Sequence, residues 1–208
     1  MNTGEPAQQG YPCWGPINPG EQPTMNTPDT PRSVLDFWYS PALREHWFGG
    51  SPHIDTAITE RFEKLWQDAR DDKLNAWAAT AEGALALVII LDQFPLNMYR
   101  GQALSFSTEA RSRAVAAHAI ATGLDAELNT EQKLFLYMPY MHSESLDDQN
   151  RCIELFTKAG MTEQLPWAEH HRRIVQRFGR FPHRNIPLGR DSTPEEIEWL
   201  NSEQGFHG

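Results

Sequence analysis

The stretch Glu82–Phe94, EGALALVIILDQF, decides how this 208-residue chain folds. It is apolar on almost every side, which is typical of a helix buried in a protein core. Its uninterrupted apolar run, Ala84–Leu91, has eight residues, whereas a helix needs about 20 to span a bilayer. The stretch therefore predicts a core helix of a soluble protein. Pro95 predicts the end of that helix, because proline cannot donate the next backbone hydrogen bond.

Helical patterns continue on both sides of this stretch. Ser51 and Pro52 have the form of a helix cap followed by a first-turn proline, and apolar residues then recur at spacings of three and four: Ile54, Ile58, Phe62, Leu65 and Ala69. Further helices are predicted at 107–121, 129–139, 145–160, 166–178 and 193–200, the last opening with a capping box at Thr193. Sustained strand-like alternation is missing from the sequence. We therefore predict an all-α fold, a tetratricopeptide-like stack of antiparallel helix pairs without a β-sheet.

The two ends of the chain differ in composition from the middle. Residues 1–31 hold seven prolines and four glycines, and such a segment cannot bury enough apolar surface to offset its ordering entropy. We expect a disordered tail over 1–31, a single helical domain over 32–202, and a C-terminal tail over 203–208.

Charge and cysteine content limit the compartment and the partners. The net charge is −10, which argues against nucleic-acid binding. Cys13 and Cys152 form neither a disulfide framework nor a metal-spaced pair, as expected in a reducing cytoplasm. The segment before Arg32 has no lysine or arginine, which secretory and mitochondrial signals require. We expect a cytoplasmic protein with no membrane partner; its oligomeric state is not indicated.

Polar residues gather at the ends of the predicted helices. The first group contains Asp92, Gln93 and Arg100. Asp92 lies at the C-terminal end of the buried helix, where the helix dipole disfavours negative charge and where a carboxylate needs a cationic or donor partner. It is either paired with an arginine that fixes the loop or an acid that faces a ligand.

A second group, His142, Glu144 and Gln149, lies between two predicted helices. In extended backbone, His142 and Glu144 point the same way. They could serve as a general base and its orienting group, or, with another histidine, as metal ligands; alternatively, Glu144 only helps to begin the next helix. His171 shares a helical stripe with Trp167, Ile174 and Phe178, which predicts a core histidine or an inward-facing base.

The third group is the stretch RFGRFPHRNIPLGR, residues 177–190, which we call the arginine loop. Its prolines stiffen the backbone, so its side chains lose little entropy when they are held in place. Arginine pairs bidentately with carboxylates and phosphates. The loop therefore either fastens the C-terminal segment to acids such as Asp92 and Glu144 or lines a pocket for an anionic ligand. The candidate residues are Arg180, His183, Arg184, Asn185 and Arg190.

Long motifs make the chain similar to a known family. In order, VLDFWYSP, HWFGG, LVIILDQFPLNMYRG, FLYMPYMHSES and HRRIVQRFGRFPHRNIPLGRDSTPEE resemble the DUF924 family of bacterial proteins over residues 33–202. The resemblance implies a tetratricopeptide-like helical fold and suggests that the polar groups belong to one site, but it implies no reaction. Leu96 stands where the family usually has arginine: if that arginine contacts an anionic ligand, this chain has lost one contact, and if it forms a surface ion pair, little changes.

Three functions follow from these groups. The first is the binding of a small anionic ligand or a carboxylate-bearing peptide by Asp92, Gln93, Arg100, Gln149 and the arginine loop. The second is a hydrolase-like acid–base enzyme, with His142 or His171 as base, Glu144 or Asp92 as orienter and an arginine clamp. The third is a buried network that only fixes the order of the helices. No cofactor is expected, because phosphate-loop and nucleophile-elbow motifs are missing from the sequence, and no metal is expected, because spacing alone does not define a site.

Overall fold

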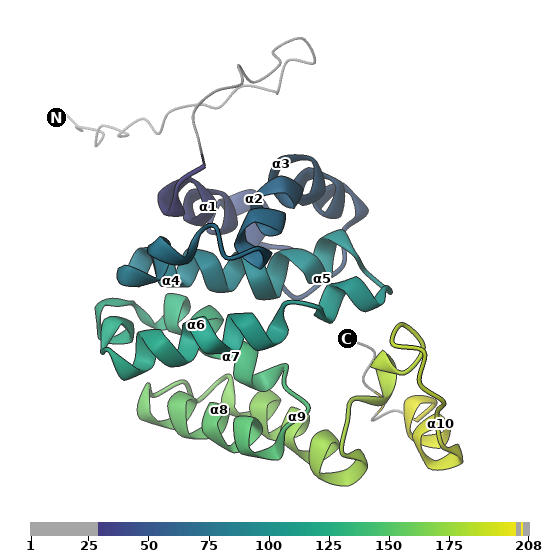
Figure 1. Ribbon diagram of the computed structural model, residues 1–208. Coiled ribbons are helices and arrows are strands. Elements are labelled where there is room, and N and C mark those ends of the chain that lie inside the picture. The colour runs from purple at the N-terminus through teal and green to yellow at the C-terminus, as the bar shows by residue number, and fades with distance from the viewer. Residues whose placement is uncertain (1–28, 203–204, 206–208) are drawn as a thin grey trace, which may run out of the picture.

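The computed structural model describes residues 29–202 and Gly205, and over these residues its regular structure is helical, without strands (Figure 1). The all-α prediction is confirmed. The main helices are α1 (Pro31–Trp38), α2 (Pro41–Arg44), α3 (Pro52–Arg70), α4 (Ala81–Val88), α5 (Phe94–Met98), α6 (Glu109–Ala121), α7 (Thr130–Met141), α8 (Leu146–Lys158), α9 (Leu165–Phe178) and α10 (Pro194–Leu200). The predicted disorder of residues 1–28 and the predicted tail at 203–204 and 206–208 lie outside the described residues.

The helices form successive layers. In Figure 1, α1–α3 lie above α4 and α5, followed by α6 and α7, then α8 and α9, with α10 set to one side. α4 packs against α1, α6 and α7, and the order continues through α7 with α8 and α8 with α9. Neighbours in the chain are thus neighbours in space. The tetratricopeptide-like character of this stack stays a prediction.

Local capping signals place most helix starts correctly. The capping boxes at Asn129 and Thr193 are both present, and α3 begins directly after Ser51. α6 is preceded by Thr108 instead of the predicted Ser107. Sequence reasoning misses α1 and α2. α1 begins at Pro31, inside the segment predicted as a tail. It is missed because it is short and follows a proline-rich stretch.

Pro95 does not end the central helix, contrary to the prediction. Between α4 and α5 the helix widens into one π turn, Ile89–Gln93, and α5 then continues to Met98. A proline leaves the carbonyl four residues earlier without its donor. Here that carbonyl belongs to Leu91, and it accepts a hydrogen bond of 2.6 Å from the hydroxyl of Thr108. A tertiary contact therefore replaces the missing backbone bond.

Pro139 does not end its helix either, because α7 continues to Met141. The turn that follows is held by Gln149. Its Nε2 donates to the carbonyl oxygens of Met141 at 2.6 Å and of Ser143 at 2.7 Å. Gln149 is fully buried in this position and supplies donors to carbonyls that the helix leaves unpaired at its end.

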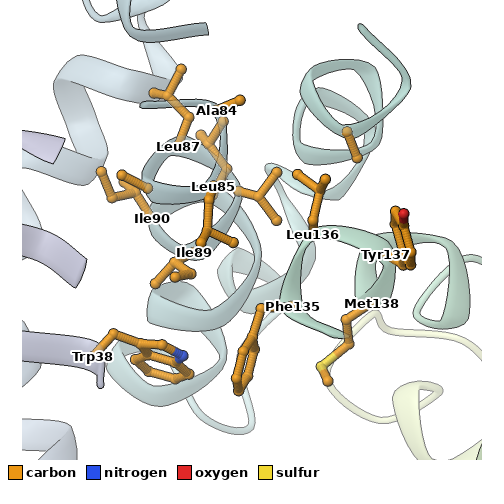
Figure 2. Packing of buried hydrophobic residues seen from close by; sticks show 14 of the residues in the cluster. Trp38, Ala84, Leu85, Leu87, Ile89, Ile90, Phe135, Leu136, Tyr137 and Met138 are labelled. Atoms are coloured by element: carbon orange, nitrogen blue, oxygen red, sulfur yellow. The ribbon is translucent and has the colours of Figure 1, made fainter. Parts of the chain in front are cut away.

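The core lies where α4 meets the helices above and below it. Figure 2 shows Leu85, Ile89 and Leu136 packed between α4 and α7, with Trp38 and Phe135 beneath them. The rings of Trp38 and Phe135 meet edge to face at 5.3 Å. The segment Ala81–Met98 is long and apolar enough to pass as a membrane span by length and composition, but 78% of it is buried inside the protein. A buried core helix passes the same test.

α10 rests on a second, smaller core. Ile174, Val175, Phe181 and Trp199 are its buried members, and Phe178 packs against them. α9 ends at Gly179, which has a φ of 69°, a left-handed conformation that glycine adopts without strain. The chain therefore turns sharply there, and the arginine loop runs back toward the ends of α6 and α7.

Candidate functional site

Asp92 lies in the π turn, and its side chain is completely buried. Its Oδ2 lies 3.0 Å from Nδ1 of His142, the residue that follows α7. Of the two alternatives for Asp92, pairing with an arginine is not what the described residues show: the basic side chain beside its carboxylate is the imidazole of His142. Oδ1 of Asp92 is also buried and has no hydrogen-bond partner among the described residues. Such an atom is costly to bury, and π turns often occur at functional sites.

Gln93 fixes the carboxylate from the other side. Its Nε2 donates to Oδ2 of Asp92 at 2.6 Å and also lies 3.3 Å from Sδ of Met138 in α7. Oδ2 is therefore shared by the amide of Gln93 and the imidazole of His142. The π turn and the end of α7 are joined through this one oxygen atom.

The exposed part of His142 lies away from the carboxylate. Its Nδ1 is buried, while 15% of the side chain is exposed, so the exposure belongs to side-chain atoms other than Nδ1. The contact with Asp92 is close enough for an ion pair, although its angle is not that of a hydrogen bond. Catalytic hydrogen bonds are often poorly aligned before a ligand binds.

Arg184 reaches the same region from the arginine loop. Its Nη1 lies 2.9 Å from Oε1 of Glu109, the first residue of α6, and donates to Oε2 at 3.2 Å. The guanidinium also lies over the rings of Phe106 and Phe181, at 4.5 and 4.8 Å from their centroids. Burial raises the pKa of Glu109, whereas Arg184 and His142 oppose that rise. His142 thus lies close enough to the Glu109–Arg184 pair for its charge to affect the pKa of Glu109.

His171 and His183 lie on the two sides of Phe181. Their ring centroids are 5.7 and 5.6 Å from that of the phenyl group. Nδ1 of His171 lies 2.8 Å from the carbonyl oxygen of Trp167. The predicted stripe is correct for His171, which is buried, but Trp167 at the start of α9 is 62% exposed.

Burial keeps both of these imidazoles neutral. Burial, as the largest cause, together with nearby positive charges such as Arg184, lowers the pKa of His171 to about 4 and that of His183 to about 3. A positive charge on His142 also lowers the pKa of both rings. The three histidines, from the end of α7, from α9 and from the arginine loop, are therefore close enough for the charge of one to affect the protonation of the others.

These two histidines should make the protein less stable in weak acid. An unfolded histidine has a pKa of about 6.5, so below that pH the unfolded chain binds protons that the folded chain does not. The free energy of unfolding therefore falls as the pH drops from about 6.5 toward 4, by up to about 1.4 kcal/mol per pH unit for each histidine. We expect His183→Asn to remove roughly one such increment from the slope, measured by urea denaturation at several pH values. Parallel slopes for the two proteins would contradict this.

Glu144 and Arg190 form a bidentate ion pair. The two distances are 2.7 and 2.9 Å, and Oε1 of Glu144 also accepts from the amide of Phe181 at 2.8 Å. The guanidinium and the amide hydrogen bond hold the pKa of Glu144 below its usual value. Glu144 therefore fastens the arginine loop to α7, and His142 takes Asp92 instead of Glu144 as its carboxylate.

Arg180 is used in the same way. It makes two hydrogen bonds, of 2.7 and 2.9 Å, to the carboxylate of Glu196 in α10. Asn185 is fully buried and donates to Oε2 of Glu196 at 3.2 Å while accepting from Nε of Arg190 at 3.0 Å. For Arg180 and Arg190, the interpretation as a fastening of the C-terminal segment fits the geometry.

Two of the predicted ligand-binding residues, Arg100 and Gln149, make contacts outside this group of side chains. Arg100 lies just after α5 and pairs with Asp55 of α3 at 3.0 and 3.1 Å, with half of its side chain exposed. Gln149 serves the end of α7, as described above. Leu96, where the family usually has arginine, is partly exposed in α5. The structure brings together six predicted residues, which we call the central cluster: Asp92, Gln93, His142, His171, His183 and Arg184. The other predicted residues of this region hold the arginine loop in place through ion pairs and hydrogen bonds: Glu144, Arg180, Asn185 and Arg190.

Sequence reasoning misses Glu109, the carboxylate that pairs with Arg184 of the central cluster. In the sequence it reads only as an acidic residue in the first turn of a helix, which is common because of the helix dipole. Its pairing with Arg184, 75 positions later, leaves no local signal. An acid partner for the arginine loop is predicted, but its identity is not.

Among residues 29–202, no three His, Cys, Asp or Glu side chains form a group suited to hold a metal ion. One surface hollow of about 390 Å³ lies near α1 and the start of α7, and another of about 450 Å³ lies between α9 and α10. Neither is lined by residues of the central cluster.

The layered helices and the central cluster define an all-helical protein with a buried Asp–His pair beside an internal Glu–Arg pair. The chain belongs to the DUF924 family, described as bacterial proteins of unknown function, whose family model matches residues 34–204. The resemblance noted from the sequence motifs is thereby confirmed.

A solved structure has a similar fold. It is that of ATU0120, a protein of unknown function from Agrobacterium tumefaciens, with 38% sequence identity and a TM-score of 0.78. The match covers 82% of the present chain and 96% of that one. A comparison with curated proteins gave no match.

Proposed function

We propose that the central cluster is a proton-transfer site of a hydrolase-like enzyme, with His142 as its general base and acid. The observation that carries this proposal is the buried carboxylate of Asp92 next to the buried Nδ1 of His142, whose side chain is 15% exposed. This is the arrangement in which a carboxylate orients an imidazole for proton transfer.

Asp92 would determine which nitrogen of His142 carries the proton. A carboxylate at 3.0 Å from Nδ1 favours the proton on that nitrogen, so Nε2 is left as the acceptor. The amide of Gln93 keeps the carboxylate in place. Asp92 and Gln93 are therefore positioning residues, and His142 is the group that would touch a substrate.

Arg184 would act on negative charge that develops during the reaction. Its guanidinium is almost fully buried, and charge interactions are stronger where water is excluded. Glu109 neutralises it in the resting state, so the pair adds little net charge to the site.

Binding of a small anion by the arginine loop, the first function that the sequence predicts, has less support. Arg180, Arg184 and Arg190 each face a carboxylate of the same chain. An incoming anion would have to displace one of them, and would leave a buried or half-buried carboxylate unpaired.

The test is a screen for hydrolysis with p-nitrophenyl acetate, p-nitrophenyl phosphate and p-nitrophenyl glycosides. We expect one class to be turned over, and we expect His142→Gln and Asp92→Asn to lower the rate by about 10²–10⁴-fold, which is the usual contribution of general acid–base catalysis. The matched control is His118→Gln, since His118 is exposed on α6 and lies outside the central cluster. Circular dichroism would show that each variant is folded.

A second measurement does not depend on the substrate. If Asp92 holds the proton on Nδ1, Nε2 of His142 should react with diethyl pyrocarbonate faster than expected from the 15% exposed fraction of its side chain. Asp92→Asn should remove this excess reactivity. Peptide mass mapping would compare His142 with the exposed His53 and His118. A rate at His142 that is unchanged by Asp92→Asn, together with no turnover in the screen, would refute the proposal.

A further inference from the structure

The hollow between α9 and α10 lies apart from the central cluster. It has a volume of about 450 Å³, within the range of small-molecule sites. Its lining residues come from one face of α9 and from α10: His170, Arg173, Ile174, Arg177, Phe178 and Trp199.

The floor of the hollow is apolar and aromatic. Ile174 and Trp199 are only 3% and 6% exposed and belong to the small core under α10. The rings of Phe178 and Trp199 lie 5.4 Å apart at an angle of 56°. Two aromatic rings held at an angle present faces and edges on which a further ring can stack.

The rim of the hollow is basic, although the whole chain has a net charge of −10. None of the six lining residues is acidic. Arg173 is well exposed, and its ion pair with Glu169 has a distance of 3.9 Å, so redirecting this side chain costs little. Arg177 is held by Glu195 at 2.9 Å and lies over the ring of Phe178 at 4.8 Å. Arg173 is thus the available cation, whereas the charge of Arg177 is already paired with Glu195.

We propose that this hollow binds a small aromatic anion, a planar ring that carries a phosphate or a carboxylate. The ring packs against Phe178 and Trp199, and the anionic group pairs with Arg173, which presents a planar fork suited to both groups. The site goes beyond the proposed function, because it shares no residue with the Asp92–His142 pair.

The test is a titration of the full-length ¹⁵N-labelled protein with phenyl phosphate, followed by two-dimensional NMR. We expect the indole N–H signal of Trp199, assigned with Trp199→Phe, to shift and to saturate. Benzoate should produce the same shift, because it combines a ring with an anion. Inorganic phosphate, which lacks the ring, and benzyl alcohol, which lacks the charge, should each bind at least about tenfold more weakly.

Variants separate this site from general electrostatic attraction. Arg173→Glu should weaken phenyl phosphate binding by about tenfold or more, because it replaces the pairing cation by a repelling charge. Arg151→Glu makes the same charge change at another exposed helix arginine with an intrahelical acid partner, and it should leave binding unchanged. Asp92→Asn should also leave it unchanged.

Three results would overturn the proposal. The first is a Trp199 signal that does not move with phenyl phosphate. The second is an equal loss of binding in Arg173→Glu and Arg151→Glu, which would show that binding depends on the net charge of the protein and not on a specific pairing with Arg173. The third is inorganic phosphate binding as tightly as phenyl phosphate, which would show that the aromatic floor contributes nothing.

Discussion

Arg184→Ala is expected to lower the free energy of unfolding by about 3–5 kcal/mol, the usual cost of breaking a buried ion pair from one side. The guanidinium of Arg184 is 6% exposed and the carboxylate of Glu109 is 14% exposed. Without Arg184, Glu109 keeps its buried position but loses its cation. The rings of Phe106 and Phe181 also lose the planar group that packs over them.

Urea denaturation of the wild type and the variant would measure this effect. Arg151→Ala is the matched control, because it breaks an exposed pair with Glu154, for which we expect a change of less than about 1 kcal/mol. The double variant Glu109→Gln with Arg184→Met should recover much of the loss, since it leaves no buried charge unpaired. If Arg184→Ala costs no more than Arg151→Ala, the pair does not stabilise the cluster.

Phe94→Ala is expected to have a comparable effect, about 3–5 kcal/mol, as found when large aromatic residues are removed from a core. Phe94 is fully buried. Its ring stacks on Phe62 at 4.7 Å and meets Trp38 at 5.8 Å. Its amide closes the π turn on the carbonyl of Ile89, so the cavity would form under the same turn that carries Asp92.

The same denaturation experiment applies, with Phe94→Leu as the control. Leucine fills most of the space, so we expect it to cost much less than alanine. In Phe94→Ala the excess reactivity of His142 toward diethyl pyrocarbonate should also decrease, because the π turn that holds Asp92 is loosened. A large stability loss with full reactivity would show that the site does not depend on this part of the core.

Features that depend on neighbouring residues are readily predicted from this sequence. The capping boxes at Asn129 and Thr193 involve side chains and amides three positions apart, and the predicted helices begin where they lie. The burial of α4 follows from composition alone. That the arginine loop pairs with carboxylates also follows from composition, because arginines in an acidic chain find carboxylates, and Glu144 is one of the two partners named from the sequence.

Features that depend on distant residues are not predicted. Pro95 reads as a helix stop, and only the hydroxyl of Thr108, from the next layer, makes it tolerable. Glu109 cannot be chosen among the acidic residues as the partner of Arg184 without coordinates. The pairing of Asp92 with His142 instead of an arginine likewise depends on where α7 ends against the π turn.

The π turn has a consequence for how the chain can change its length. Each residue of an α-helix advances the direction of its side chain by about 100°, and a π turn accommodates one additional residue within a helix. Losing a single residue from Ile89–Leu91 would therefore let this segment return to ordinary α-helical winding while α4 and α5 keep the faces that they present to their neighbours, whereas a deletion inside α4 would rotate everything after it by about 100°. The turn that carries Asp92 is thus a place where the helix can change its length by one residue without repacking the helices on either side.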